Sequence, residues 1–421
     1  MFKNINCKNL PSLRRNIVYQ FLYELLIVFI PLFTIPYVSR VLGAENIGLF
    51  SYTYAVANYF VLFANLGIKN YGSRTIAMVR NNKEELNRNF SEILSIHIIF
   101  SIIVIFVYLV LLFFFVEDNL VIFLIQSIYV FAAVFDINWF FFGIEKFKLT
   151  VGRNTLVKIL SVFLVLVFVK TQTDLWIYAL ILALSVFVGQ SVVWFALKQY
   201  VSWRRPSWAN MKQHIRPLFV LFLPILALSL YKYMDKIMLG SISSNVQVGF
   251  YENAEKIINV PMSLIMAFGV VLMPRIANMV TSKDKGEVFK LIDMSMEAVM
   301  LLAIAISFGL AGISFVLAPI FFGYEFEECG ILIMGLAVTV PFMAFANVIR
   351  TQYLIPYKED KIFVVSLFLG AAVNLIVNII LIPYMAARGA VIGTIFAEII
   401  VCIYQSYFVR KKIFIKKYLL N

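Results

Sequence analysis

The stretch LYKYMDKIMLG, residues 230–240, places three charges at the end of an apolar run that begins at Pro217 and is long enough to cross a bilayer. On a helix, Lys232, Asp235 and Lys236 share one face, because positions three and four apart are neighbours. A charge at the bilayer centre costs about 2.5–3.5 kcal/mol, so this face should not contact lipid. One carboxylate neutralises only one of two ammonium groups. We therefore expect a wet, positively charged cavity wall that accepts an anion; the alternative is a buried structural ion pair.

Composition supports a membrane protein. The 421 residues are 62% hydrophobic and 14% charged, whereas soluble domains are about half apolar and a quarter charged. The net charge of +13 does not indicate nucleic-acid binding, because the basic residues are scattered between apolar runs, as membrane topology requires. Three cysteines and two histidines predict neither a disulfide framework nor a metal site, and no cofactor is expected.

Apolar runs near the required length of ~20 residues predict an all-α, polytopic fold with twelve transmembrane helices. The helix of the shortest run, 155–169, is expected to begin a few residues before the run itself. The runs are 17–38, 47–68, 93–116, 120–142, 155–169, 175–197, 217–239, 248–273, 291–318, 331–349, 362–384 and 389–408.

The charges of the connecting segments alternate along the chain. Every second connection is rich in lysine and arginine, whereas the others hold only Arg40, Lys170 and Arg388, and one carries the acidic run 325–328. Because basic residues favour the cytoplasmic side, both termini are predicted to be cytoplasmic. The first apolar run has no small-residue cleavage site and is interpreted as a retained helix rather than a signal peptide.

An internal repeat divides the chain. The pattern of residues 40–50, RVLG followed by IGLF, reappears in residues 236–251 as KIMLG followed by VGFY. Both copies run from an outer helix end to an inner one, which predicts two six-helix lobes with pseudo-symmetry about the membrane normal. The predicted lobes are 1–201 and 217–421, the second with a basic cytoplasmic tail, joined by a cytoplasmic linker at 202–216.

Further charged residues lie in or beside the predicted spans, and each has two interpretations. They line the cationic cavity, or they anchor helix ends and form structural ion pairs. The basic members of this set are Arg40, Arg74, Lys256 and Arg275, and the acidic members are Glu24 and Asp136.

Asn374 and Asn378 stand one turn apart on one face of the eleventh predicted span, and Thr394 lies in the twelfth. Amide and hydroxyl side chains often join transmembrane helices. Together with Asp235, they alternatively form an oxygen-rich site for a coupling cation, Na⁺ or H⁺.

Five segments resemble the polysaccharide transporter family, the O-antigen and capsule repeat-unit flippases of the multidrug/oligosaccharidyl-lipid/polysaccharide exporter superfamily. The resemblance runs from about Asn16 to Phe408. The segments are 35–43 (IPYVSRVLG), 65–74 (NLGIKNYGSR), 136–145 (DINWFFFGIE), 235–240 (DKIMLG) and 374–383 (NLIVNIILIP).

This resemblance implies a flippase that moves undecaprenyl-pyrophosphate-linked oligosaccharide from the inner to the outer leaflet of the bacterial cytoplasmic membrane by alternating access. The lysine and arginine residues would bind the pyrophosphate, without covalent chemistry. The resemblance also implies a Na⁺ site at Asp235, Asn374, Asn378 and Thr394, although Asn378 stands where related lipid II flippases can have a carboxylate. Membrane lipids, and a polymerase and glycosyltransferases of the same pathway, are the implied partners.

Two other functions remain open at this point. A cation-coupled multidrug or small-solute antiporter of the same superfamily would have a cavity lined by carboxylates and aromatic rings. A membrane polymerase or glycosyltransferase would need a large external loop or an acidic metal-binding motif, and the sequence has neither. A transporter rather than an enzyme is therefore predicted.

Overall fold

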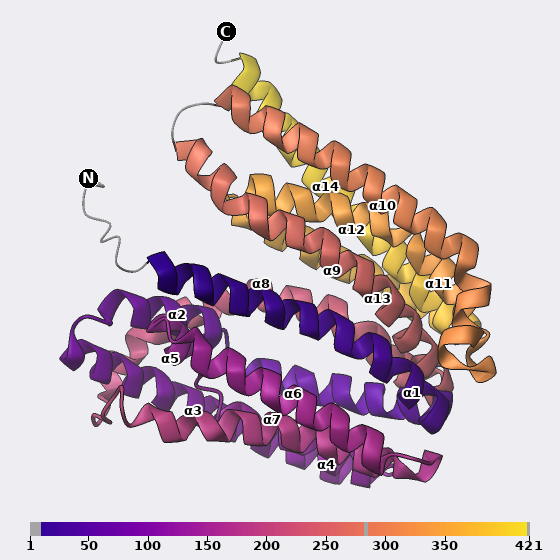
Figure 1. Cartoon of the computed structure of the whole chain (residues 1–421), viewed down its shortest axis with the longest axis horizontal. Coiled ribbons are helices and arrows are strands. Elements are labelled where there is room, and N and C mark those ends of the chain that lie inside the picture. Colours follow the sequence, from indigo (N-terminus) through magenta and orange to yellow (C-terminus); the bar gives the residue numbers. More distant parts are fainter. Residues whose placement is uncertain (1–9, 282–284, 419–421) are drawn as a thin grey trace. The chain divides into compact units, whose positions relative to one another are not determined.

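The computed structural model describes residues 10–281 and 285–418, and side chains within 33–146, 149–230, 232–269, 272–280 and 286–410. The described chain is helical and has no strand, which confirms the all-α prediction (Figure 1). Eleven helical segments of the described residues are long and apolar enough to cross a membrane. The exact number of twelve crossings stays a prediction.

The described helices follow the predicted apolar runs in order. They are α1 (Leu10–Asn65), α2 (Ile68–Val79), α3 (Lys83–Phe115), α4 (Leu120–Val134), α5 (Asn138–Gly143), α6 (Phe147–Phe168), α7 (Leu175–Leu197), α8 (Trp208–Ile242), α9 (Asn245–Thr281), α10 (Lys285–Phe322), α11 (Cys329–Ala337), α12 (Thr339–Val348), α13 (Asp360–Met385) and α14 (Ala387–Tyr418), with short turns η2 (Gln172–Asp174) and η3 (Tyr324–Phe326) and a π-helix η4 (Ile349–Leu354).

The chain forms two compact units, one of Met1–Leu42 with Val56–Ile225 and the other of Gly43–Ala55 with Leu226–Asn421. These units differ from the predicted lobes, because residues 43–55 pack within the second unit and the start of α8 within the first. The non-helical connection before α8 is residues 198–207, so the predicted linker 202–216 includes the start of α8 at Trp208. Residues 208–216 are polar, so a search for apolar runs misses this part of the helix. The pseudo-symmetry of two six-helix lobes stays a prediction.

The predicted span 120–142 matches one candidate membrane span, Leu120–Gly143, but its helix is broken into two, α4 and α5. The break follows from Asp136, whose carboxylate accepts hydrogen bonds from the backbone N–H of Asn138 at 3.0 Å and from the Asn138 side chain at 2.7 Å. A side chain that binds the backbone two residues on favours a turn over a continuing helix.

Helix α1 changes direction at Gly43, whose φ of 77° lies in the left-handed region. The next residue, Ala44, begins the second half of α1. Its backbone N–H donates a hydrogen bond to the Glu325 carboxylate at 2.8 Å. A carboxylate at a helix N-terminus satisfies an unpaired donor and interacts favourably with the helix dipole. Glu325 of the acidic connection therefore has a capping role in the second unit.

The glycines of the internal repeat contact each other in the second unit. A Cβ on Gly48 would lie 1.6 Å from the carbonyl oxygen of Asn245 and 2.8 Å from the backbone nitrogen of Gly249. A Cβ on Gly249 would lie 2.1 Å from the carbonyl oxygen of Ala44. The second half of α1 and the start of α9 thus approach backbone to backbone, as small residues allow between membrane helices.

We expect Gly48→Ala to lower the free energy of unfolding by about 1–3 kcal/mol or more, because the added methyl group overpacks a backbone contact. The measurement is thermal unfolding of the purified protein in detergent. Gly309→Ala is the matched control, since a Cβ on this α10 residue meets nothing within 4 Å and alanine favours a helix. Equal melting temperatures for the two variants would contradict the contact.

In the first unit, two segments that carry the family resemblance pack against each other. Gly72 of α2 lies so close to Trp139 of α5 that a Cβ would be 2.5 Å from the indole ring. Gly143 of α5 lies against Ile76 of α2 in the same way. Both aromatic and small residues of these segments therefore serve helix packing.

Candidate functional site

The second unit gathers oxygen and amide groups around one buried carboxylate, Asp235 of α8, whose exposed fraction is 4%. Its Oδ1 accepts a hydrogen bond from Asn378 Nδ2 at 2.5 Å, and its Oδ2 accepts from Thr394 Oγ1 at 3.1 Å. Asn378 Nδ2 also donates to Asn374 Oδ1 at 3.1 Å. The structure thus brings together the four residues that the sequence grouped, from α8, α13 and α14. Their role as a cation site stays a prediction.

A fifth member of this cluster, Tyr251 of α9, is absent from the predicted set. Its hydroxyl donates to Asp235 Oδ2 at 2.6 Å and lies 3.0 Å from Thr394 Oγ1. The internal repeat holds a signal for it: the first copy has Phe50 at this place, whereas Tyr251 of the second copy carries a hydroxyl group.

Asn378 Oδ1 is a buried acceptor without a hydrogen-bond partner, on a residue that is 0% exposed. Gly393 of α14 faces this oxygen closely, since a Cβ there would lie 2.2 Å from it. An orphaned buried oxygen beside a carboxylate, a second amide and two hydroxyl groups fits a monovalent cation or a proton, which need oxygen ligands and at least one negative charge. The described residues contain no group of three or more His, Cys, Asp and Glu side chains that could hold a metal ion.

Beside the Asp235 cluster, α8 and α9 form a buried network of ion pairs. Lys236 Nζ lies 2.5 Å from Glu252 Oε2 and 2.8 Å from Glu255 Oε2. Glu252 also pairs with Lys256, whose Nζ lies 3.2 Å from Glu252 Oε1. The Lys236 side chain is 9% exposed and that of Glu252 14%, so this is an internal network rather than a surface one.

The network corrects the expected charge balance of α8. Asp235 does not neutralise a neighbouring ammonium group in the described structure, because its carboxylate binds hydroxyl and amide groups. Adjacent residues of a helix point in different directions, so Lys236 meets Glu252 and Glu255 instead. Two glutamates that the sequence did not place against Lys236 therefore offset its positive charge.

The other predicted cations are distributed more widely. Lys232 is exposed, has no ion pair within the described structure, and has its ammonium group 5.2 Å from the centre of the Tyr233 ring. Arg275 is exposed on α9, about 28 Å from Lys256 along a helix that rises about 1.5 Å per residue. Arg40 of α1 and Arg74 of α2 are exposed and belong to the first unit. The Glu24 side chain lies outside the described residues. The Asp136 carboxylate binds Asn138 in the turn between α4 and α5.

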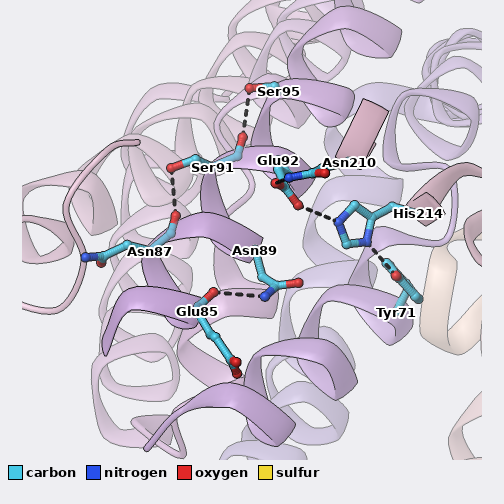
Figure 2. Close-up of polar contacts among 9 residues, drawn as sticks. All are labelled: Tyr71, Glu85, Asn87, Asn89, Ser91, Glu92, Ser95, Asn210 and His214. Atoms are coloured by element: carbon cyan, nitrogen blue, oxygen red, sulfur yellow. Dashed lines mark hydrogen bonds and ion pairs between the residues drawn. The ribbon is translucent and has the colours of Figure 1, made fainter. Parts of the chain in front are cut away.

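The first unit contains a second buried polar cluster, which sequence analysis missed (Figure 2). His214 of α8 lies between Glu92 of α3 and Tyr71 of α2: its Nε2 is 3.0 Å from Glu92 Oε2, and its Nδ1 is 2.6 Å from the Tyr71 hydroxyl. Asn210 Nδ2 donates to the other Glu92 oxygen at 3.0 Å. The side chains of His214 and Glu92 are 4% and 2% exposed. The cluster fastens the first turns of α8 to α2 and α3.

His214→Leu should destabilise the protein, because Glu92 Oε2 and the Tyr71 hydroxyl each lose a buried hydrogen-bond partner, at about 1–3 kcal/mol per group. Unfolding in detergent measures the loss. Tyr71→Phe serves as the graded comparison, since it removes one hydrogen bond and keeps the pair of Glu92 and His214. If both variants unfold like the wild type, the cluster does not hold α8.

Comparison with known proteins gives one family and several relatives. The sequence profile of a family described as "Polysaccharide biosynthesis protein" matches residues 13–280. A candidate O-antigen transporter of Escherichia coli strain K12 is 26% identical over 409 residues, which cover 96% of this chain and 98% of that protein.

Two solved structures share the fold. The lipid II flippase MurJ in an inward closed conformation superposes with a TM-score of 0.72 at 15% identity, covering 94% of this chain and 87% of that one. An inward-facing multidrug resistance MATE transporter gives a TM-score of 0.71 at 14% identity, covering 94% and 98%. At these identities the likeness concerns the fold alone.

Proposed function

Because this chain belongs to the polysaccharide biosynthesis protein family, we propose that it is a flippase that moves undecaprenyl-pyrophosphate-linked oligosaccharide repeat units from the inner to the outer leaflet. The chain is a multi-pass membrane protein. The E. coli relative is named for O-antigen transport, and one solved structure of the same fold is a lipid II flippase. None of the proteins compared above is an enzyme by name, so the chain acts as a transporter in surface polysaccharide synthesis.

The observation that carries this proposal is the pair of ammonium groups one helical turn apart on α8. Lys232 and Lys236 are one turn apart at the end of the apolar run of α8, in a helix long and apolar enough to cross a membrane. A diphosphate with its sugars cannot cross hydrocarbon, whereas the polyprenyl tail need not leave it. Lysine side chains on a membrane helix therefore suit a lipid whose anionic head has to be carried. Alternating access then exposes the head to each side in turn.

Asp235, Tyr251, Asn374, Asn378 and Thr394 would hold the coupling cation, Na⁺ or H⁺. When bound, the cation neutralises the buried carboxylate and supplies the energy of its gradient. The four hydrogen-bonding side chains orient Asp235 and exclude other charged groups from it. Cation binding and lobe movement are coupled if the cation binds one conformation more tightly than the other.

The protein would work in the bacterial cytoplasmic membrane, with both termini in the cytoplasm. Its partners would be the glycosyltransferases that build the lipid-linked oligosaccharide inside and the polymerase that consumes it outside. Membrane lipids surround it, and nucleic acid has no part in this function.

The test is leaflet exchange of a fluorescent polyprenyl-diphosphoryl oligosaccharide in proteoliposomes, detected by a membrane-impermeant quencher. We expect exchange in the presence of the protein and none in protein-free liposomes. The same vesicles are assayed with a cationic dye. Dye transport without lipid exchange would replace the proposal by a multidrug antiporter, and sugar polymerisation by the purified protein would replace it by an enzyme.

A further inference from the structure

Lys236 is not free to bind an anion in this structure. Two carboxylates, Glu252 and Glu255, lie within 2.5 and 2.8 Å of its ammonium group. The two carboxylates already bind an ammonium group whose side chain is 9% exposed, so an incoming anion has to compete with them for Lys236.

The two glutamates have the charge of the proposed substrate. A diphosphate that carries a lipid on one side and a sugar on the other has two negative charges, as do Glu252 and Glu255 together. Lys232, Lys236 and Lys256 supply three positive charges on the same two helices. If the diphosphate bound with both glutamates still in place, this group of five side chains would change from a net charge of +1 to −1.

We propose that Glu252 and Glu255 are internal counter-anions that compete with the substrate diphosphate for Lys236, and that their return to Lys236 expels the substrate. This inference rests on the proposed function and adds a mechanism of release to it. Substrate binding exchanges one set of anions for another, so the buried Lys236 is never left unpaired in a membrane interior, where an uncompensated charge is costly.

Glu255 is the counter-anion that leaves first. It pairs with Lys236 alone, whereas Glu252 bridges Lys236 and Lys256. Its side chain is also more exposed, 26% against 14% for Glu252. Lys236 keeps one ion pair when Glu255 moves away, so this exchange leaves no buried ammonium group without a carboxylate.

The network is also adjacent to the candidate cation site. Asp235 precedes Lys236 on α8, and Tyr251 precedes Glu252 on α9, with Tyr251 bound to Asp235 at 2.6 Å. A cation at Asp235 would add positive charge near the glutamate that the substrate displaces. It would stabilise that carboxylate away from Lys236 and so favour the state with substrate bound. The same pair of helices therefore links cation binding to anion exchange.

The experiment compares equilibrium binding and leaflet exchange of a fluorescent polyprenyl-diphosphoryl oligosaccharide in wild type and Glu255→Gln. Glutamine keeps the size of the side chain and removes one competing charge. We expect binding to tighten roughly tenfold, the effect of one moderately screened charge, and exchange to slow because release is impaired. Glu287→Gln, at an exposed position of α10, is the matched control and should change neither quantity.

Two further measurements make the test decisive. Glu252→Gln should tighten binding more than Glu255→Gln, because Glu252 pairs with two lysines, Lys236 and Lys256, whereas Glu255 pairs with one. Either variant tests the inference if the other does not fold. A probe with a single phosphate carries one negative charge, so its affinity should rise less in these variants than the affinity of the diphosphate probe. Unchanged or weaker diphosphate binding in a variant with a wild-type melting temperature, or equal gains for both probes, would overturn the inference. A wild-type protein that neither binds nor exchanges the diphosphate probe would instead overturn the proposed function.

Discussion

Asp235→Asn should uncouple lipid exchange from the cation gradient. The carboxylate accepts hydrogen bonds from Tyr251, Asn378 and Thr394. An amide at this position has one acceptor oxygen and no charge, so it can neither hold a cation nor accept all three donors. Coupling between two sites is typically worth 5–150-fold in affinity, so we expect an imposed Na⁺ or H⁺ gradient to lose its effect and the driven rate to fall at least tenfold. Proteoliposomes with either gradient measure this directly.

The control for this variant is Asp293→Asn, the same chemical change at an exposed position of α10. Tyr251→Phe should give an intermediate result, because it removes one hydrogen bond and leaves the carboxylate in place. Gradient-driven exchange at the wild-type rate in a folded Asp235→Asn protein would show that this cluster does not couple transport to a cation.

The order and extent of the long helices are predictable from the sequence because a bilayer demands long apolar runs. The helix start at Trp208 is not, because its first turns are polar and are held by Glu92 and Asn210 rather than by lipid. The break at Asp136 is missed for a related reason. One carboxylate that binds the backbone ends a helix locally, and hydrophobicity averaged over the run 120–142 does not register it.

The candidate site was partly predictable. Asn374 and Asn378 share a helix face by their spacing, and both their oxygen chemistry and the family resemblance grouped them with Asp235 and Thr394. Contacts between α8 and α9 could not be predicted from the sequence, because they depend on how each helix is rotated about its axis. That rotation turns Glu252 and Glu255 toward Lys236. It also explains why the positive charge expected from the sequence of α8 alone is offset by carboxylates of α9.

Lys236→Gln should lower the free energy of unfolding by about 3–5 kcal/mol, the cost of breaking a buried ion pair by removing one partner. Without the ammonium group, Glu252 would keep only Lys256 as an ion-pair partner. Glu255 would lose the ion pair with Lys236, and the two carboxylates would repel each other. Thermal or denaturant unfolding in detergent measures the loss. Lys232→Gln is the control, because Lys232 is exposed and has no ion pair among the residues that the structure describes.

Adding Glu255→Gln to Lys236→Gln should recover much of the lost stability. The double variant removes one positive and one negative charge together, and leaves Glu252 paired with Lys256. The effects of substitutions at two residues in contact on the free energy of unfolding are not additive. The double variant should therefore unfold at a clearly higher temperature than the Lys236→Gln protein. A double variant that is as unstable as the sum of the two single changes would mean that Lys236 and Glu255 do not interact. The internal counter-anion would then have no physical basis, even if the lipid is still exchanged.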